Sequence, residues 1–247
     1  AKKITNKEAG VDGSYMLWTT TGNYLWQELL FTHGGEMLSS DGKSVGFNTP
    51  AGLKTFEVLH DLVTQGGMEN LTDEQASQAF IAGRIGLFFC SSARVNNFAK
   101  QIGTRFEVRT APFPSPTPDS KVVSGGATMM IFAKDAEKQA AAWEFIKFAG
   151  GPVGQTIMVR HIGYMPSNQI AIDTPEMLGN FYRDNPNMRT AITQLPRATR
   201  WLGFPGPNSL KAIQVIYDNM ESVVAGRTAP NDALDRSVTQ VQAVLPK

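Results

Sequence analysis

The sequence is poor in several features that would narrow its function at once. Its 247 residues include one cysteine, Cys90, so an internal disulfide and a cysteine-based zinc cluster are excluded. Neither charge sign dominates, because 23 Lys and Arg balance 22 Asp and Glu for a net charge of +1. Without a basic excess, we expect no nucleic-acid partner. No apolar run approaches the roughly 18 residues of a membrane-spanning helix, so we expect no bilayer crossing.

Motifs of catalysis are missing as well. The chain has no G-x-S-x-G elbow, no P-loop, no G-x-G-x-x-G and no H-E-x-x-H. Its three histidines, His33, His60 and His161, are far apart, and none has a partner at ligand spacing. The sequence therefore predicts no catalytic residue, no metal site and no cofactor.

The composition and the order of the segments predict a folded α/β protein. Hydrophobic residues make up 42% of the chain and include 14 Phe and 4 Trp, which supplies a core that disordered chains lack. At ~150 residues per domain, the length predicts one or two domains. Short β-like runs alternate with helical ones, with strands expected at 15–20, 84–89, 106–111 and 128–133. The prolines of 112–118 predict an extended crossing between domains.

Two helix starts are marked by local chemistry. Thr49 before Pro50 has the form of an N-cap followed by proline at the first helical position. Thr72 with Gln75 three residues later has the form of a capping box. Helices are expected from these points, and further ones at 24–31, 92–100 and 136–149.

Aromatic residues flank one polar break in the chain. Trp18, Tyr24 and Trp26 lie on either side of residues 19–23, which carry hydroxyl groups, a glycine and an amide. A sugar or polyol presents flat C–H faces and many hydroxyl groups, so its site needs an aromatic surface beside short hydrogen-bonding side chains. The pattern indicates a candidate solute site, and ordinary packing of these side chains in a core is the alternative.

Other segments carry groups that bind polar ligands. Ser91-Ser92 and Ser124-Gly125-Gly126 can present backbone amides to an oxygen-rich or anionic group, with helix capping as the alternative. Tyr164 lies on a turn after a helix. Arg197 and Arg200 lie on an expected loop, where a guanidinium can hold a phosphate or carboxylate through two parallel hydrogen bonds. Capping of the preceding helix, or simple exposure to water, is the alternative for this pair.

Several segments together resemble the extracellular solute-binding proteins of bacterial ABC importers, in the group that binds sugars, oligosaccharides and glycerol phosphates. Their order and spacing across nearly the whole chain carry the resemblance, and the glycerol-3-phosphate-binding branch is the most similar. The segments are Tyr24-Leu25-Trp26 with Gly34-Gly35, then residues 79–87, Gly125-Gly126-Ala127, residues 141–148 and residues 163–168.

The resemblance implies which residues contact the solute. An aromatic surface is implied at Trp26, with Asn23 or Tyr24 beside it, and a phosphate clamp at Arg200 or Arg197. A second tryptophan of that branch is replaced here by Asn23, so a neutral sugar stays open beside a glycerol phosphate. The remaining implied contacts are the amide of Gly126, the hydroxyl of Tyr164 and, as a looser match, Ser92.

The resemblance also implies a two-lobed α/β fold of the periplasmic-binding-protein type, with the solute in an interlobe cleft and no catalysis. Family members carry roughly another hundred residues before the matched part, so the N-terminal lobe is expected to be largely missing from this chain. Residues 1–118 and 169–247 would then form the C-terminal lobe, and 119–168 a remnant of the N-terminal lobe with the hinge crossings.

The function that follows is delivery of a sugar, polyol or glycerol-phosphate-type solute to the membrane permease of an ABC importer. The protein is expected to be a monomer that is periplasmic, or extracellular and membrane-associated. A carbohydrate-active enzyme is one alternative and would need two carboxylates about 5–10 Å apart across a cleft. A structural or adaptor module that binds no solute is the other.

Overall fold

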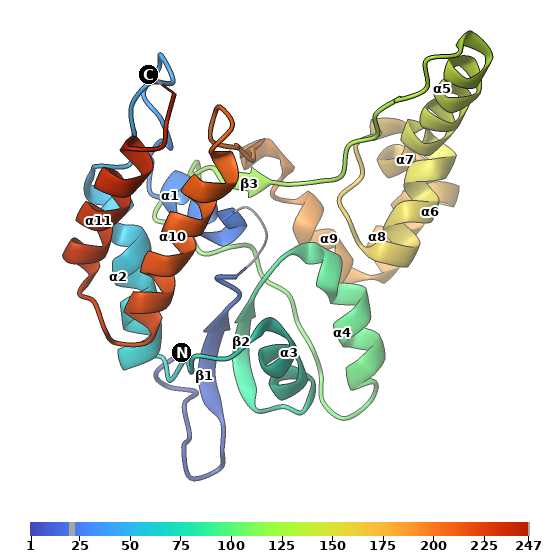
Figure 1. Ribbon diagram of the computed structural model, residues 1–247. Helices are drawn as coiled ribbons and strands as arrows, with labels where there is room; N and C mark the ends of the chain where they lie inside the picture. The colour runs from blue at the N-terminus through green and yellow to red at the C-terminus, as the bar shows by residue number, and fades with distance from the viewer. Residues whose placement is uncertain (20–22, 247) are drawn as a thin grey trace. The chain divides into compact units, whose positions relative to one another are not determined.

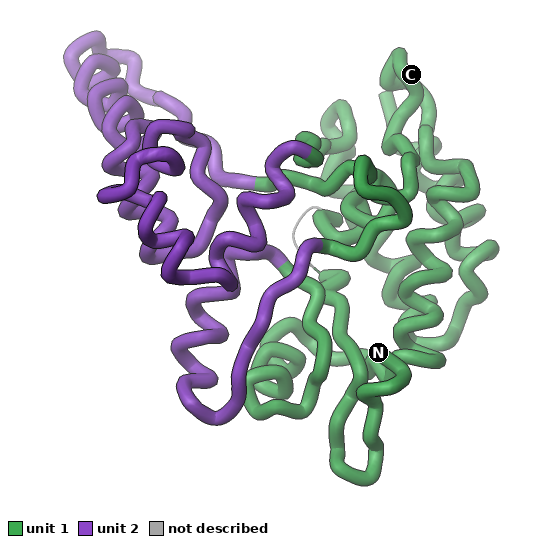
Figure 2. Tube along the Cα trace, turned by 180° about the vertical axis from the view of Figure 1, so that it is seen from behind, with its two compact units in different colours: residues 1–90, 113–125, 197–247 green, residues 91–112, 126–196 purple. Residues whose placement is uncertain are grey.

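The computed structural model describes residues 1–19 and 23–246, and the chain divides into two compact units. Unit 1 comprises residues 1–90, 113–125 and 197–247, and unit 2 comprises residues 91–112 and 126–196 (Figure 2). The chain therefore passes between the units at four points, next to Cys90, Pro112, Gly125 and Pro196. The assignment of 1–118, 119–168 and 169–247 to lobes of a longer protein stays a prediction.

Unit 1 combines two short parallel strand pairs with helices. Its elements, in chain order, are β1 (Asp12–Met16), α1 (Tyr24–Thr32), α2 (Pro50–Thr64), α3 (Asp73–Ile81), β2 (Ile85–Phe89), β3 (Val122–Ser124), β4 (Ala198–Arg200), α10 (Ser209–Val224) and α11 (Pro230–Gln242). β1 pairs with β2 in parallel, with Asp12 opposite Ile85, and β3 pairs with β4 in parallel, with Val123 opposite Thr199.

The caps expected in unit 1 are confirmed. The Thr49 hydroxyl accepts the backbone N–H of Gly52, and Pro50 opens α2. At the start of α3, the Thr72 hydroxyl accepts the N–H of Gln75 at 3.2 Å, and the Gln75 side chain accepts the N–H of Thr72 at 2.9 Å. Both helices begin where predicted because each cap satisfies amides of the first turn within the same few residues.

The core of unit 1 lies where α1, α2, α10 and α11 pack together, and Figure 1 shows α2, α10 and α11 side by side. Trp26 of α1 is fully buried there with its ring edge-on to Phe47, the ring centroids 5.1 Å apart. Ile216 and Met220 of α10 are equally buried. This core fixes the two helices, α1 and α10, that carry the candidate site.

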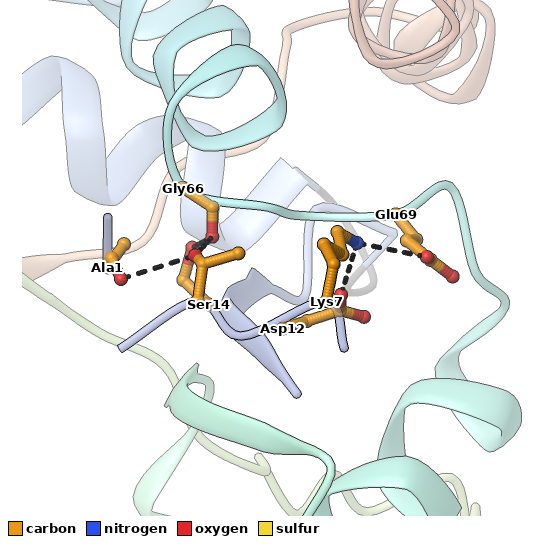
Figure 3. Close-up of polar contacts among 7 residues, drawn as sticks. Ala1, Lys7, Asp12, Ser14, Gly66 and Glu69 are labelled. Carbon is orange, nitrogen blue, oxygen red and sulfur yellow. Dashed lines mark hydrogen bonds and ion pairs between the residues drawn. The ribbon is translucent and has the colours of Figure 1, made fainter. Parts of the chain in front are cut away.

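Side-chain contacts fasten the N-terminal segment of unit 1 to the segment after α2 (Figure 3). The Lys7 ammonium forms ion pairs with Asp12 at 2.5 Å and Glu69 at 3.2 Å, while the Ser14 hydroxyl donates to the Gly66 carbonyl at 3.3 Å. The hydrogen bond between Lys7 and Asp12 raises the pKa of Lys7. Because Lys7 is exposed, each pair stabilises the fold by no more than about 1 kcal/mol.

Unit 2 is helical. A small core of Val159, Ala171, Leu178, Tyr182 and Met188 holds it together. Its elements are a 3₁₀ turn (Ser92–Arg94), α4 (Val95–Ile102), α5 (Ala136–Gly150), α6 (Pro152–Ile162), α7 (Gln169–Asp173), a π-helical turn (Pro175–Gly179), α8 (Asn180–Asp184) and α9 (Pro186–Ile192).

The strand expected at 106–111 is wrong. Among the described residues this segment belongs to no strand. Asn187 of α9 takes over its backbone groups: the Asn187 side chain accepts the Thr110 N–H at 3.0 Å and donates to the Val108 carbonyl at 2.7 Å. A side-chain amide here replaces the strand partner that the β-like composition predicted.

The strand expected at 128–133 is also wrong for this chain. These residues form no ladder in the described structure, and their apolar side chains are exposed, with Met130 at 70% and Phe132 at 84%. The following helix α5 has no buried residue, and Trp143 is 53% exposed. Apolar side chains of both 128–133 and α5 are thus exposed, and these two segments together are called the apolar face of unit 2.

Candidate functional site

The site begins at Asn23, the N-cap residue directly before α1. Its φ of 59° is left-handed, and Asn23 is the one non-glycine residue of the described chain with a positive φ. Asparagine tolerates this conformation better than most residues. Two hydrogen bonds hold it against α10: its backbone N–H donates to the Tyr217 hydroxyl at 3.2 Å, and its side-chain amide donates to the Ile213 carbonyl at 3.2 Å.

A hollow of about 290 Å³ lies next to this contact, entirely within unit 1. Trp18, which follows β1, forms one part of its lining and is 6% exposed. The rest of the lining comes from Thr19 and from the α10 residues Gln214, Tyr217, Asp218 and Glu221. The hollow thus combines two aromatic rings with hydroxyl, amide and carboxylate groups, which suits a solute with apolar faces and polar edges.

Three buried polar atoms without a hydrogen-bond partner belong to residues that are close in sequence to the start of α1. In the described part of the chain these are Trp18 Nε1, Asn23 Oδ1 and Trp26 Nε1, three atoms within nine residues of sequence. A buried donor or acceptor without a partner costs about 1–3 kcal/mol. Among the described residues of unit 1, the buried side-chain polar atoms without a hydrogen-bond partner therefore belong to Trp18, Asn23 and Trp26.

The next turn of α1 is tied to β3, the strand before the Gly125 crossing. The Tyr24 hydroxyl donates to the Val123 carbonyl at 2.8 Å, and the Glu28 carboxylate accepts the Val123 N–H. Gly125 lies against the Tyr24 ring, and a Cβ there would be 3.0 Å from Tyr24 Cε2. These contacts give Tyr24 a structural role in unit 1.

The electrostatics of this contact follow from burial. Burial raises the pKa of Glu28 to about 7, although the Val123 N–H and the nearby Arg197 guanidinium favour its charged form. Burial, followed by the Glu28 carboxylate, raises the pKa of the Tyr24 hydroxyl above its ordinary value. Near neutral pH, Glu28 is therefore close to its titration midpoint.

The two candidate arginines have different surroundings. Arg197 donates to the Ser115 hydroxyl at 2.8 Å and to the Ser120 carbonyl at 3.4 Å, so its guanidinium links the 113–125 segment to β4. Arg200, at the end of β4, is exposed and lies opposite Ser124 in the β3–β4 register. Of the pair, Arg200 is the one whose side chain is open to solvent.

Trp26 is placed differently from the expectation drawn from the resemblance. Its side chain is 0% exposed and packs on Phe47, which is the core role that the sequence left open as the alternative. In this structure its ring presents no face to a solute. Trp18, the third aromatic residue of the break, is the one that lines the hollow.

The remaining candidates lie in unit 2. Gly126 is exposed, and a Cβ added there would meet no atom within 4 Å. Tyr164 and Ser92 are half-buried, with Ser92 in the 3₁₀ turn before α4. In unit 1, Asn23 contacts Tyr217, which lines the hollow, and Tyr24 follows Asn23 as the first residue of α1. The solute roles of all eight candidates stay predictions.

Sequence reasoning missed the α10 side of the hollow. Gln214, Tyr217, Asp218 and Glu221 recur at intervals of three and four, which marks one helix face. This spacing of polar residues is the signal in the sequence that could have indicated the α10 wall of the hollow. In the described residues, no group of three or more His, Cys, Asp or Glu could hold a metal ion. No helix there is both long and apolar enough to cross a bilayer.

Comparison with known families decides the relationship. The family model described as bacterial extracellular solute-binding protein matches residues 1–190. The chain belongs to this family. Its sequence is similar to the sn-glycerol-3-phosphate-binding periplasmic protein UgpB of Escherichia coli, with 22% identity over 251 residues, and to UgpB of Pectobacterium atrosepticum, with 24% identity over 206 residues.

Solved structures of solute-binding proteins confirm the fold class. UgpB from Mycobacterium tuberculosis in complex with glycerophosphocholine has a TM-score of 0.81 and 18% identity, covering 98% of this chain and 60% of its own. The cyclic α-maltosyl-1,6-maltose binding protein from Arthrobacter globiformis has a TM-score of 0.74 and 25% identity, covering 94% and 59%. The expected α/β fold of the periplasmic-binding-protein type is confirmed.

The chain is shorter than the relatives it matches. It spans 57% of the Escherichia coli protein although 98% of the chain is aligned, and it spans 46% of the Pectobacterium protein with 81% aligned. Both of these relatives are therefore longer than the 247 residues of this chain.

Proposed function

We propose that this solute-binding protein is the substrate-binding component of an ABC importer, located in the periplasm, or extracellular and membrane-associated. The observation that carries the proposal is the hollow in unit 1, where Trp18 and Tyr217 lie beside hydroxyl, amide and carboxylate groups. Aromatic faces with a few polar groups are the usual lining of a sugar or polyol site. The partner is the importer's membrane permease, and the protein acts as a monomer without catalysis.

The proposed solute is a sugar, polyol or glycerol-phosphate-type molecule. Similar proteins support this range, because one is named for sn-glycerol 3-phosphate, one was solved with glycerophosphocholine, and MalE3 of T. maritima with maltose. In unit 1 the solute would meet the hollow and the exposed guanidinium of Arg200. Ser92, Gly126 and Tyr164 remain candidate contacts in unit 2, and Trp26 supports the site from the core.

We further propose that the apolar face of unit 2 belongs to a lobe completed by the rest of the polypeptide. Residues 127–133 are apolar at almost every position, which is typical of a strand buried on both faces in a parallel sheet. In this chain the same residues have no ladder, and Phe132 is 84% exposed. Such a run is exposed to solvent when the strands that would pair with it are not present.

Calorimetric titration with maltose, sn-glycerol 3-phosphate and glycerophosphocholine tests the function. We expect at least one of them to bind, and Trp18→Ala to weaken it at least about tenfold, because the hollow loses one aromatic wall. Trp201→Ala, at an aromatic residue outside the hollow, is the matched control. A broad panel of sugars, polyols and phosphates with no ligand-induced heat or thermal shift would contradict the proposal.

A further inference from the structure

Three side chains on one face of α1 are placed to bind one edge of β3. Tyr24, Glu28 and Thr32 are spaced four residues apart, so they lie on the same side of the helix. Four residues of an α-helix rise about 6 Å, and two residues of a strand rise about 6.6 Å. Side chains at this helical spacing can therefore reach successive backbone groups along one edge of a strand.

The hydrogen bonds follow this match. Thr32 donates to the Lys121 carbonyl at 2.9 Å. The Glu28 carboxylate accepts the Val123 N–H, and the Tyr24 hydroxyl donates to the Val123 carbonyl at 2.8 Å. On its other edge β3 pairs with β4. Helix α1 therefore takes the place of a neighbouring strand, and the middle one of its three groups is a carboxyl.

The same helix fixes the backbone on either side of Arg200, the exposed guanidinium of the candidate site. Ser124 of β3 lies opposite Arg200 in the register. Two residues after Arg200, the Gln27 side chain bonds to both backbone groups of Leu202, at 2.8 and 3.0 Å. Movement of β3 away from α1 would therefore change where this guanidinium lies.

Few ionisable groups face Glu28 from the elements around it. The Arg197 guanidinium favours its charged form, but Arg197 also donates hydrogen bonds to the 113–125 segment. On α1 itself the Tyr24 hydroxyl lies one turn earlier, with Cys90 close to it. The strand β3 carries only valine and serine. Helix α2 packs against α1, and the residues that it buries are not ionisable: Gly52, Thr55, Phe56 and Leu59.

Ionisation of Glu28 works against this arrangement. The side chain is buried, and a buried carboxylate is costly unless donors surround it. Burial accordingly raises the pKa of Glu28 to about 7, although the Val123 N–H and Arg197 oppose the shift. The contact between α1 and β3 is therefore most stable below a pH of about 4.5 and loses stability as the pH rises through about 7.

We propose that Glu28 is a positioning residue of the solute site: its neutral form holds β3 against α1 and keeps Arg200 in place, and its ionised form loosens this hold. The inference rests on the proposed function and adds control by protons to it. Solute affinity should fall as the pH rises past neutrality, because the binding arrangement becomes a smaller fraction of the population. This dependence requires no titrating group on the solute.

The proton-dependent step can be measured without any solute. In the ¹⁵N-labelled chain, the backbone amide signals of Val123 and Arg200 are followed from about pH 5.5 to 8.5. We expect both to shift with a midpoint at about pH 7, the Val123 signal more strongly because its N–H bonds to the carboxylate. Glu28→Gln keeps an oxygen for this N–H and should abolish both transitions. An Arg200 signal that does not follow the titration of Glu28 would overturn the positioning role.

Calorimetry at about pH 6 and pH 8 measures the consequence for binding, with maltose and glycerophosphocholine, neither of which titrates in this range. We expect the wild-type affinity for the probe that binds to be about two- to tenfold lower at the higher pH, and Glu28→Gln to bind equally at both. With sn-glycerol 3-phosphate, whose own phosphate titrates, the wild type is compared with Glu28→Gln at each pH.

Thr32→Val is the matched control. It removes another hydrogen bond from α1 to the segment before β3 but no charge, so the pH dependence of binding should stay that of the wild type. His33, at the C-cap of α1, is present in every variant, so the comparison with Glu28→Gln subtracts its contribution.

The outcomes separate this inference from the proposed function. A pH dependence that Glu28→Gln retains, or equal wild-type affinities at both pH values, would overturn the inference and leave the solute-binding function standing. If no sugar, polyol or phosphate binds at either pH, the function fails and the inference fails with it. The unfolding transition of each variant checks its folding, and the wild-type titrations decide the outcome where a variant does not fold.

Discussion

The Val123 backbone N–H donates to the Glu28 carboxylate, and this joins the middle of α1 to the strand that precedes the Gly125 crossing. Glu28 is 4% exposed, and Arg197, the first residue of unit 1 after the Pro196 crossing, is close enough to favour its charged form. One buried carboxylate of unit 1 thus interacts with residues next to two of the four crossings.

This arrangement predicts how stability depends on pH. The pKa of Glu28 rises from 4.5 to about 7 on folding. The folded chain therefore keeps a proton that the unfolded chain releases, and stability falls as pH rises from about 4.5 to 7. Glu28→Gln removes this titration, so its free energy of unfolding relative to wild type should rise by about 3 kcal/mol across that range.

Urea unfolding at pH 5 and pH 8 measures the effect. The glutamine side chain keeps an oxygen that can accept the Val123 N–H, so the comparison isolates the charge. Glu74→Gln, at an exposed acid in the first turn of α3, serves as the control and should follow the wild-type profile. Parallel pH profiles for wild type and Glu28→Gln would contradict the prediction.

Tyr24→Phe tests the second contact with β3. The change removes the hydroxyl that donates to the Val123 carbonyl and should lower the free energy of unfolding by about 1 kcal/mol. Tyr182→Phe in unit 2 is a suitable control, since the described residues show no hydrogen bond from that hydroxyl. If denaturant unfolding shows Tyr182→Phe to be the more costly change, Tyr24 does not anchor β3 as described.

Substitution of the two arginines should separate a role in stability from a role in solute binding. Arg197→Ala loses hydrogen bonds to Ser115 and Ser120 and should cost about 1–3 kcal/mol of stability. Arg200→Ala, at an exposed position, should change stability by less than about 0.5 kcal/mol and weaken a phosphate-bearing solute. Thermal unfolding and calorimetry together check this; equal stability losses would show that the assignment is wrong.

The apolar face of unit 2 gives a prediction about dye binding. Met130→Ser with Phe132→Ser should reduce the fluorescence of a bound hydrophobic dye while changing the free energy of unfolding by less than about 0.5 kcal/mol, because both side chains are exposed. Phe98→Ser, at a 5% exposed residue of α4, should instead destabilise the chain by about 3 kcal/mol or more. A large stability loss from the exposed pair would mean that these residues pack in solution.

A structural feature of this chain could be predicted from the sequence where the residues that cause it lie close together along the chain. The starts of α2 and α3 were predictable because Thr49, Thr72 and Gln75 satisfy amides within three residues of themselves. The loss of the strand at 106–111 was not, because the groups that replace it belong to Asn187, about 80 residues later. Local composition contains no information about such a partner.

The candidate site shows the same limit. Of the three aromatic residues that flank residues 19–23, Trp18 lines the hollow, and a solute role for this segment stays a prediction. Trp26 differs because helix α1 turns its side chain toward Phe47, and only packing reveals that direction. The opposite wall on α10 lies about 190 residues away, so the pairing of Asn23 with Tyr217 depends on the tertiary fold.

Side chains of helix α1 form hydrogen bonds with the backbone groups of neighbouring segments. Gln27 forms hydrogen bonds in both directions with the backbone of Leu202. Thr32 donates to the Lys121 carbonyl and Tyr24 to the Val123 carbonyl, while the Glu28 carboxylate accepts the Val123 N–H. Peptide groups are the same in every residue, so the segments at 121–123 and 202 can change sequence over evolution without losing these bonds. Conservation is therefore expected to concentrate on the four side chains of α1, while the strands they hold are free to diverge.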